Sequence, residues 1–186
     1  MSQATNDFLG DTTDLLARTP KVVRALLYGL PDAWAGTADT DGGWRPRDVV
    51  GHLITAEEDN WIARIERLLS EGTSRPFDTF NRTAHVGRDD ALGLDELVER
   101  FETLRAADLK RLGELVTGAD LDKKGMHPAL GEVTLRELLS SWTVHDLDHI
   151  SQIFAGMAGS RDADVGAWKT YLGILLRRDD PAAVPG

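Results

Sequence analysis

Two histidines four residues apart, His145 and His149, are the side chains of this sequence best suited to holding a metal ion. They lie in a segment whose apolar residues recur every three or four positions, which predicts an amphipathic helix over residues 135–153. Thr134 followed by Glu137 forms a capping-box pattern, which predicts where this helix begins. Side chains four apart lie one above the other on a helix face, so both imidazoles can point at one ion.

The spacing of these histidines leaves two interpretations open. A His-x-x-x-His pair on a helix is a recurrent way to bind a transition metal, but two core or surface histidines also fall four apart by chance. A third ligand must come from elsewhere, because the chain has no cysteine and Asp146 and Asp148 lie off the line joining the two rings. These aspartates are interpreted as exposed charges or as groups that orient their neighbours, and Gln152 as a hydrogen-bonding group in the core.

Composition predicts one globular domain over residues 1–178, followed by a disordered tail over residues 179–186. The chain has 186 residues, of which 41% are hydrophobic and 28% charged, as in ordinary globular proteins. Its net charge of −10 and its lack of a basic run argue against a nucleic-acid partner and against an anionic membrane surface. No apolar stretch approaches the length of a membrane span, and no signal peptide is visible, so a cytoplasmic location is expected. Without cysteine, any thiol chemistry would need an external thiol.

The rest of the chain must position these histidines, and its apolar periodicity predicts four further helices. These four helices cover residues 11–30, with either a kink or two pieces meeting at Pro20, and residues 47–70, 94–117 and 163–177. Gly156 or Gly159 would end the histidine-pair helix. The connection over residues 71–93 is long enough to return along the second helix, so the second and third helices could run parallel. Short extended pieces are expected around Met126, His127 and Val133.

Several individual side chains carry expectations of their own. His85, in the long connection, is expected to be exposed to solvent, with a position over a pocket as the alternative. The charges of the third helix, Arg105 among them, are expected to form a solvated face. The aromatic residues of the last helix, Trp168 and Tyr171, are expected to pack against the bundle. Asp59 follows His52 by about two helical turns and is a candidate general base or substrate contact, with a solvated carboxylate as the alternative.

Three stretches, taken in order, resemble the DinB-like superfamily of metal-binding four-helix bundles. They are residues 44–53 (WRPRDVVGHL), residues 127–135 (HPALGEVTL) and residues 142–153 (WTVHDLDHISQI), and the resemblance extends over nearly the whole chain. It implies an all-α, up-down-down-up four-helix bundle with a long crossover, to which the last predicted helix is added. It also implies a divalent metal ion, zinc or nickel, and a homodimer. His52 matches the single ligand of the second helix, and His145 and His149 match the pair of the fourth.

The resemblance leaves three kinds of function open. The first is a metal-dependent transferase that uses an external low-molecular-weight thiol on a small-molecule substrate. The second is a hydrolase that uses metal-bound hydroxide, and the third is a non-catalytic bundle whose metal is structural. Because neutral imidazole is the ligand form, metal binding is expected to weaken as the pH falls through the histidine range near 6.5. The roles of His85 and His127 are left open.

Overall fold

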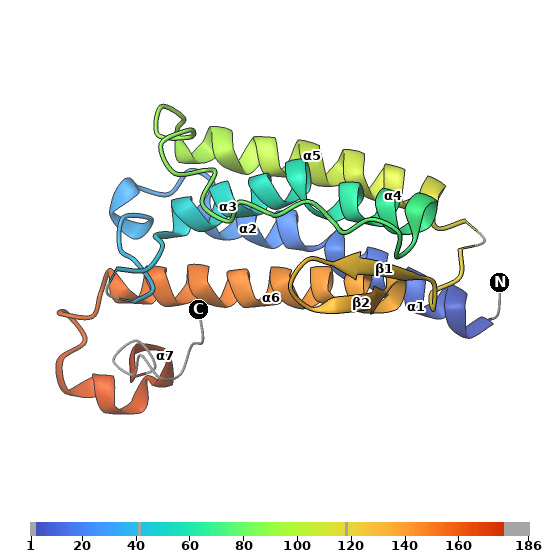
Figure 1. Ribbon diagram of the computed structural model, residues 1–186. Coiled ribbons are helices and arrows are strands. Elements are labelled where there is room, and N and C mark those ends of the chain that lie inside the picture. The colour runs from blue at the N-terminus through green and yellow to red at the C-terminus, as the bar shows by residue number, and fades with distance from the viewer. Residues whose placement is uncertain (1–2, 41, 118, 177–186) are drawn as a thin grey trace.

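The computed structural model describes residues 3–40, 42–117 and 119–176. The predicted tail over residues 179–186 lies outside these described residues. Four rods of helix make up the bundle (Figure 1). They are α1 (Gln3–Leu16) with α2 (Thr19–Leu27), α3 (Pro46–Asp59) with α4 (Trp61–Glu71), α5 (Leu94–Leu115), and α6 (Leu135–Gly159).

The direction of each rod confirms the predicted topology. The α1–α2 rod and α6 run one way, whereas the α3–α4 rod and α5 run the other way, so the second and third rods are parallel (Figure 1). Residues 72–93 return along the outside of the α3–α4 rod to make this possible. The protein is thus an all-α, up-down-down-up four-helix bundle with a long crossover.

The helix ends follow from local sequence in most places. Pro20 lies in the first turn of α2, where its missing N–H costs little, and it separates α2 from α1 as predicted. At the start of α6 the backbone N–H of Glu137 donates to Thr134 Oγ1 at 3.1 Å, and the backbone N–H of Thr134 donates to Glu137 Oε2 at 2.7 Å. This is the predicted capping box. The break between α3 and α4 falls at Asn60, where the sequence contains no proline or glycine to signal it.

A small antiparallel hairpin precedes α6 where short extended pieces were expected. Its strands are β1 (Lys124–His127) and β2 (Gly131–Thr134), with Lys124 opposite Thr134 and His127 opposite Gly131. The hairpin contacts α4, and it leads directly into the first turn of the helix that carries the histidine pair.

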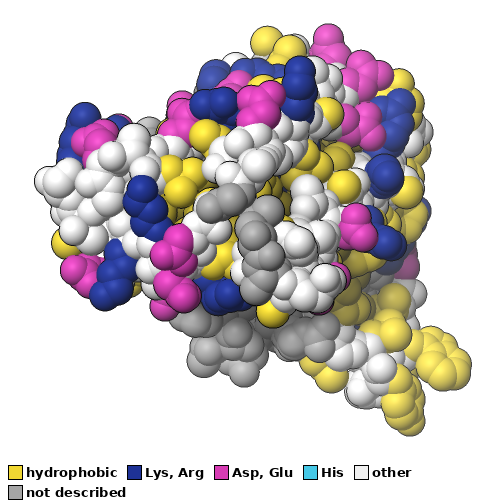
Figure 2. All heavy atoms as spheres, turned by 90° about the vertical axis from the view of Figure 1, so that its right-hand side faces the viewer, with side chains coloured by type: hydrophobic (Ala, Val, Ile, Leu, Met, Phe, Trp, Pro, Cys, Tyr) yellow, Lys and Arg dark blue, Asp and Glu magenta, His cyan; other side chains and the backbone are white. Residues whose placement is uncertain are grey.

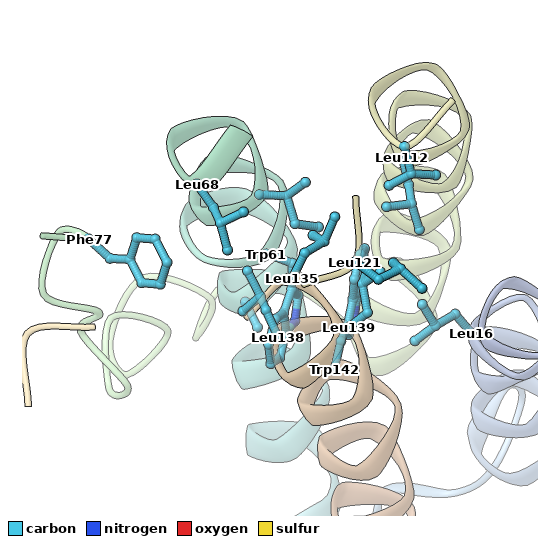
Figure 3. Close-up of a cluster of buried hydrophobic side chains, with 13 residues drawn as sticks. Leu16, Trp61, Leu68, Phe77, Leu112, Leu121, Leu135, Leu138, Leu139 and Trp142 are labelled. Atoms are coloured by element: carbon cyan, nitrogen blue, oxygen red, sulfur yellow. The ribbon is translucent and has the colours of Figure 1, made fainter. Parts of the chain in front are cut away.

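Two clusters of buried apolar side chains fill the interior of the bundle. One joins α1, α4, α5 and the first half of α6, and it includes Trp142 and Leu139 of α6 facing Leu16 and Leu112 (Figure 3). The other lies towards the opposite end, where α2, α3 and α5 meet the second half of α6 at Ile153. Burying one large apolar side chain contributes about 1.5–3 kcal/mol, so these stripes hold α3 against α6.

The chain after α6 differs from the single helix predicted over residues 163–177. It forms a 3-10 helix, η2 (Gly166–Tyr171), and a single helical turn, α7 (Gly173–Leu176). Gly166 has φ = +53°, a left-handed conformation through which a right-handed helix cannot continue. Trp168 and Tyr171 do not pack as expected, since their exposed fractions are 73% and 81%. Hydrophobic side chains accordingly protrude below the bundle in Figure 2.

In the described part of the chain, no helix combines the length and the apolar character that crossing a bilayer requires. The expected cytoplasmic location stays a prediction.

Candidate metal centre

The structure brings His52, His145 and His149 together between α3 and α6. The Nε2 atom of His145 lies 3.1 Å from Nε2 of His52 and 3.0 Å from Nε2 of His149. All three rings offer a nitrogen within 4.8 Å of the others, and in the described residues this is the one cluster with that property. Residues 93 positions apart in the sequence thus face a common point, as the metal hypothesis requires.

The outer nitrogens show which inner nitrogens carry a free lone pair. Nδ1 of His52 lies 2.9 Å from the carbonyl oxygen of Arg82, and Nδ1 of His149 lies 2.6 Å from Oε1 of Gln152. Both oxygens only accept hydrogen bonds, so both Nδ1 atoms must carry the proton. A neutral imidazole with a protonated Nδ1 has its lone pair on Nε2. His52 and His149 therefore both direct lone pairs at His145.

This donor set fits a cation better than it fits a proton. If His145 carried its own proton on Nε2, it could donate to only one of two facing lone pairs, and the other contact would be repulsive. A divalent ion accepts all three lone pairs at once, and three imidazoles are a common transition-metal ligand set. Nδ1 of His145 is buried and has no hydrogen-bond partner among the described residues.

Burial keeps the three rings unprotonated. Loss of solvation, with a smaller contribution from the neighbouring His149, lowers the pKa of His52 to about 3. The same two causes lower the pKa of His145 to about 2. Burial also lowers the pKa of His149, although the hydrogen bond that His149 donates to Gln152 opposes this effect. All three rings are therefore in the neutral, metal-binding form across the physiological pH range.

Trp44 closes one side of the cluster. Its ring centroid lies 4.7 Å from that of His52 and 6.2 Å from that of His149, and it also meets His85 edge-on at 4.9 Å. The ring of His85 lies 5.9 Å from that of His52. His85 is only 4% exposed, which corrects the expectation of a solvent-exposed loop histidine. Gly51 explains how the loop comes so close, because a Cβ atom there would lie 3.0 Å from Cβ of His85.

An open groove reaches the cluster at His145. It has a volume of about 680 Å³ and runs along the outer face of α6. Its lining residues are Arg136, Glu137, Ser140, Ser141, Val144, His145 and Asp148. His145 thus belongs both to the three-histidine cluster and to a surface that solutes can reach.

Behind the cluster lies a buried ion triad that the sequence analysis did not predict. The guanidinium of Arg105 donates to both carboxylate oxygens of Glu57, at 2.7 and 2.9 Å, and to both of Asp146, at 2.6 and 3.0 Å. The side chain of Arg105 is 1% exposed and the two carboxylates are fully buried. Arg105 is therefore not part of a solvated face, and Asp146 is not an exposed charge.

The polar residues of this triad were detectable as interruptions of apolar stripes. On α5, Arg105 continues the spacing of Val98, Phe101 and Leu112, all of which are buried. On α6, Asp146 stands between Trp142 and the buried His149 at the same three- and four-residue steps. A charged residue on such a stripe must be paired when the stripe is buried, so two of them on different helices form a candidate pair.

Burial and ion pairing act against each other in the triad. Burial would lower the pKa of Arg105, but Asp146 and Glu57 outweigh burial and hold that pKa above its usual range. Burial raises the pKa of Glu57, although Arg105 opposes this effect.

The remaining predicted site residues lie outside the cluster. Asp59, the last residue of α3, is exposed, and seven residues place it about 10 Å along the helix from His52. Its catalytic role stays a prediction. Asp148 is exposed as predicted, and Gln152 binds His149. Nδ1 of His127 accepts hydrogen bonds from the backbone N–H groups of Ala129 and Leu130 at the tip of the hairpin.

A four-helix bundle that holds three convergent imidazoles between two of its helices defines a class of candidate metal-binding proteins. Residues 15–153 match the DinB superfamily. Because the match spans about three quarters of the chain, the chain belongs to that superfamily, and the resemblance found in the sequence is confirmed.

Individual relatives agree with this assignment. A Bacillus licheniformis protein named as a candidate metal-dependent hydrolase is 30% identical over 146 residues, which cover 75% of this chain and 80% of that protein. YfiT from Bacillus subtilis, described as a probable metal-dependent hydrolase with an unusual four-helix bundle topology, is similar in structure with a TM-score of 0.66. It is 20% identical, and the match covers 83% of this chain and 86% of YfiT. The four-helix bundle protein TT2238 has a TM-score of 0.53 and 24% identity, over 79% of this chain and 98% of its own. These two likenesses support the fold.

Proposed function

We propose that this protein is a metal-dependent hydrolase whose divalent metal ion is held by His52, His145 and His149. The observation that carries the proposal is the convergence of three Nε2 atoms, two of which have their Nδ1 protons fixed by oxygen acceptors. The name of the B. licheniformis relative supports the same reaction class. Three protein ligands favour catalysis over a structural metal, because structural sites usually have four.

A divalent metal ion bound there would supply a Lewis acid and would lower the pKa of a coordinated water. The protein supplies the rest. The carbonyl of Arg82 and the amide of Gln152 orient two of the rings, and such outer contacts fix both tautomer and ring direction. Trp44 covers one side of the cluster, so a substrate would enter from the groove along α6.

The groove also contains a carboxylate suited to proton transfer. Glu137 and Asp148 both line it, but the carboxylate of Glu137 accepts hydrogen bonds from Thr134 at the start of α6. Asp148 is exposed and lies three residues after His145, on the same side of the helix. We therefore assign to Asp148, rather than to Asp59, the role of accepting a proton from an attacking water.

The thiol-dependent transferase hypothesis shares the metal site and differs in its second substrate. With no cysteine in the chain, that reaction would need an added low-molecular-weight thiol. Zinc and nickel both suit imidazole ligands, so we propose either as the ion.

The test combines metal content with turnover. Purified protein would be dialysed against Zn²⁺ or Ni²⁺, analysed for bound metal, and assayed on chromogenic esters and amides with and without glutathione. Hydrolysis that needs the metal but not glutathione supports the proposal, and turnover only with glutathione would favour the transferase. Asp148→Asn should retain the metal and lose most of the turnover. Metal binding without turnover on any probe would favour the non-catalytic alternative.

A further inference from the structure

We propose that Arg105 is a positioning residue for the metal centre. By binding Glu57 of α3 and Asp146 of α6 at the same time, its guanidinium fixes the register in which His52 meets His145 and His149. This inference rests on the proposed metal-binding function, and it assigns a role to a buried charge cluster that the proposed chemistry does not itself use.

The guanidinium connects all four rods of the bundle. It extends from α5, binds the carboxylates on α3 and α6, and donates a fifth hydrogen bond to the carbonyl oxygen of Leu16, at the end of α1, at 2.8 Å. All five N–H donors of the side chain are therefore used. Hydrogen bonds between charged groups are short and directional, and the planar fork of arginine fixes their angles.

The bound carboxylates lie close in sequence to the histidines. Glu57 follows His52 by five residues on α3, and Asp146 directly follows His145 on α6. A helix is stiff over so short a distance, so fixing Glu57 relative to Asp146 also fixes His52 relative to His145. Sliding α3 by one residue would move His52 by about 1.5 Å and turn it by about 100°, which would separate Nε2 atoms that are now 3.1 Å apart.

Apolar packing alone defines this register less strictly. The hydrophobic effect is non-directional, and cores tolerate apolar substitutions of similar volume. Replacing a buried ion triad with apolar residues often leaves a protein folded, while the specificity that the charges provided can be lost. The structure thus separates two contributions: the stripes hold α3 and α6 together, and Arg105 determines how they are aligned.

The experiment compares metal affinity with folding in three variants. Arg105→Met, Glu57→Met and Asp146→Leu are combined in one triple variant, which removes all three charges of the triad together. Glu57→Gln alone is the milder variant, and it is the more specific one because Asp146 adjoins a ligand. Arg111→Met is the matched control, since Arg111 lies on the same helix and binds Glu66 and Glu114 but is 47% exposed.

Three measurements are made on each protein. Zn²⁺ affinity is measured by competition with a chromogenic chelator, the ligand field is read from the visible spectrum of the Co²⁺-loaded protein, and folding is followed by far-ultraviolet circular dichroism during urea unfolding. The triple variant should keep the native helix content, bind Zn²⁺ about 10- to 100-fold more weakly and show an altered Co²⁺ spectrum, an effect of the size expected when the ligands are no longer held in their orientation. Glu57→Gln should weaken Zn²⁺ binding about tenfold. Arg111→Met should change neither the Zn²⁺ affinity nor the Co²⁺ spectrum.

The possible failures are distinguishable. A folded triple variant with wild-type Zn²⁺ affinity and Co²⁺ spectrum would overturn the positioning role while leaving the metal site intact. If the triple variant does not fold, Glu57→Gln decides in the same way. Wild-type protein that binds neither ion would overturn the proposed function, and this inference with it.

Discussion

Three neutral imidazoles that face one another give the protein its capacity for chemistry, and each should be needed for metal binding. We expect His52→Ala, His145→Ala and His149→Ala each to reduce bound Zn²⁺ or Ni²⁺ sharply, because two ligands hold an ion much less tightly than three. Elemental analysis after dialysis measures this directly. His127→Ala is the control, since His127 lies at the hairpin, and His85→Ala should also leave the metal content nearly intact. A His52→Ala protein with full metal content would show that His52 is not a necessary ligand.

Burial of these rings also predicts how stability depends on pH in the metal-free protein. The folded protein holds the pKa of His52 at about 3, whereas the unfolded chain returns it to about 6.5. Between these values the unfolded chain binds more protons than the folded protein, so the free energy of unfolding rises with pH in this window. The contribution of His52 to that free energy is lost as the pH falls from about 6.5 towards 3. Above pH 6.5 the contribution of His52 is fully present.

The measurement is urea unfolding at pH 7 and pH 5 in the presence of EDTA. One ring that stays neutral when folded contributes about 2 kcal/mol to the difference, so His52→Gln should lose about that much less stability than wild type between the two pH values. Equal losses in the two proteins would show that His52 titrates normally. For the same reason, metal release from the folded protein should begin below the value near 6.5 that the sequence alone suggests.

At the scale of elements, the close crossing of α6 over the start of α3 predicts an effect of a single methyl group. A Cβ atom on Gly156 of α6 would lie 2.8 Å from the carbonyl oxygen of Thr37 and 2.9 Å from Cδ of Pro46. Gly156→Ala should therefore push the two helices apart and destabilise the protein by about 1–3 kcal/mol. Gly113→Ala is the matched control in α5, where nothing lies within 4 Å, and it should stabilise by about 0.5–1 kcal/mol. Urea midpoints compare the two variants, and equal midpoints would contradict the close approach.

The helices were predictable because their signals are local. The apolar stripe and capping box of α6 define its start from a few neighbouring residues. The loop before α5 contains enough residues to return along the α3–α4 rod, so that α5 can run parallel to that rod. The break at Asn60 and the short pieces after α6 were not predictable in the same way. No neighbouring proline or glycine signals the break, and the left-handed conformation of Gly166 interrupts the helix predicted over residues 163–177.

The candidate site was predictable in part for the same reason. His145 and His149 are related by helix geometry alone, whereas His52 joined them only through the family resemblance, because no local rule relates positions 93 residues apart. The burial of His85 depends on where a long loop packs, and no periodicity in the sequence reports that. Arg105 and Asp146 did leave a signal, as charged residues on otherwise buried stripes, and an analysis of stripe continuity would have found them.

At the scale of the whole molecule, one apolar surface has no partner in the described chain. Val144, Leu147 and Phe154 are spaced three and seven residues apart along α6, so they share a face, and 63%, 50% and 42% of their surfaces are exposed. Trp168 and Tyr171 of η2 are exposed as well, at 73% and 81%, and the chain after η2 contacts α6 through α7. An aromatic side chain has about 150–250 Å² of surface, so these two alone expose roughly 300 Å². That already equals the largest patch of many monomers, about 300–600 Å².

We propose that a second copy of this chain covers this surface in a two-fold homodimer. A two-fold interface uses the same patch on both copies, so the aromatic segment of each copy can pack on the α6 face of the other, as the apolar centre of an interface of about 800 Å² per partner. Sedimentation of the wild-type protein should give a dimer mass, and Trp168→Ser combined with Tyr171→Ser should shift it towards the monomer without loss of helix content. Leu130→Ser is the matched control, because Leu130 is 76% exposed but belongs to the hairpin rather than to α6 or η2. A wild-type protein that sediments as a monomer at high concentration would rule out the dimer.

Because Val144 also lines the groove beside His145, the partner copy would border the entrance to the metal centre. The double variant should therefore alter substrate affinity as well as mass.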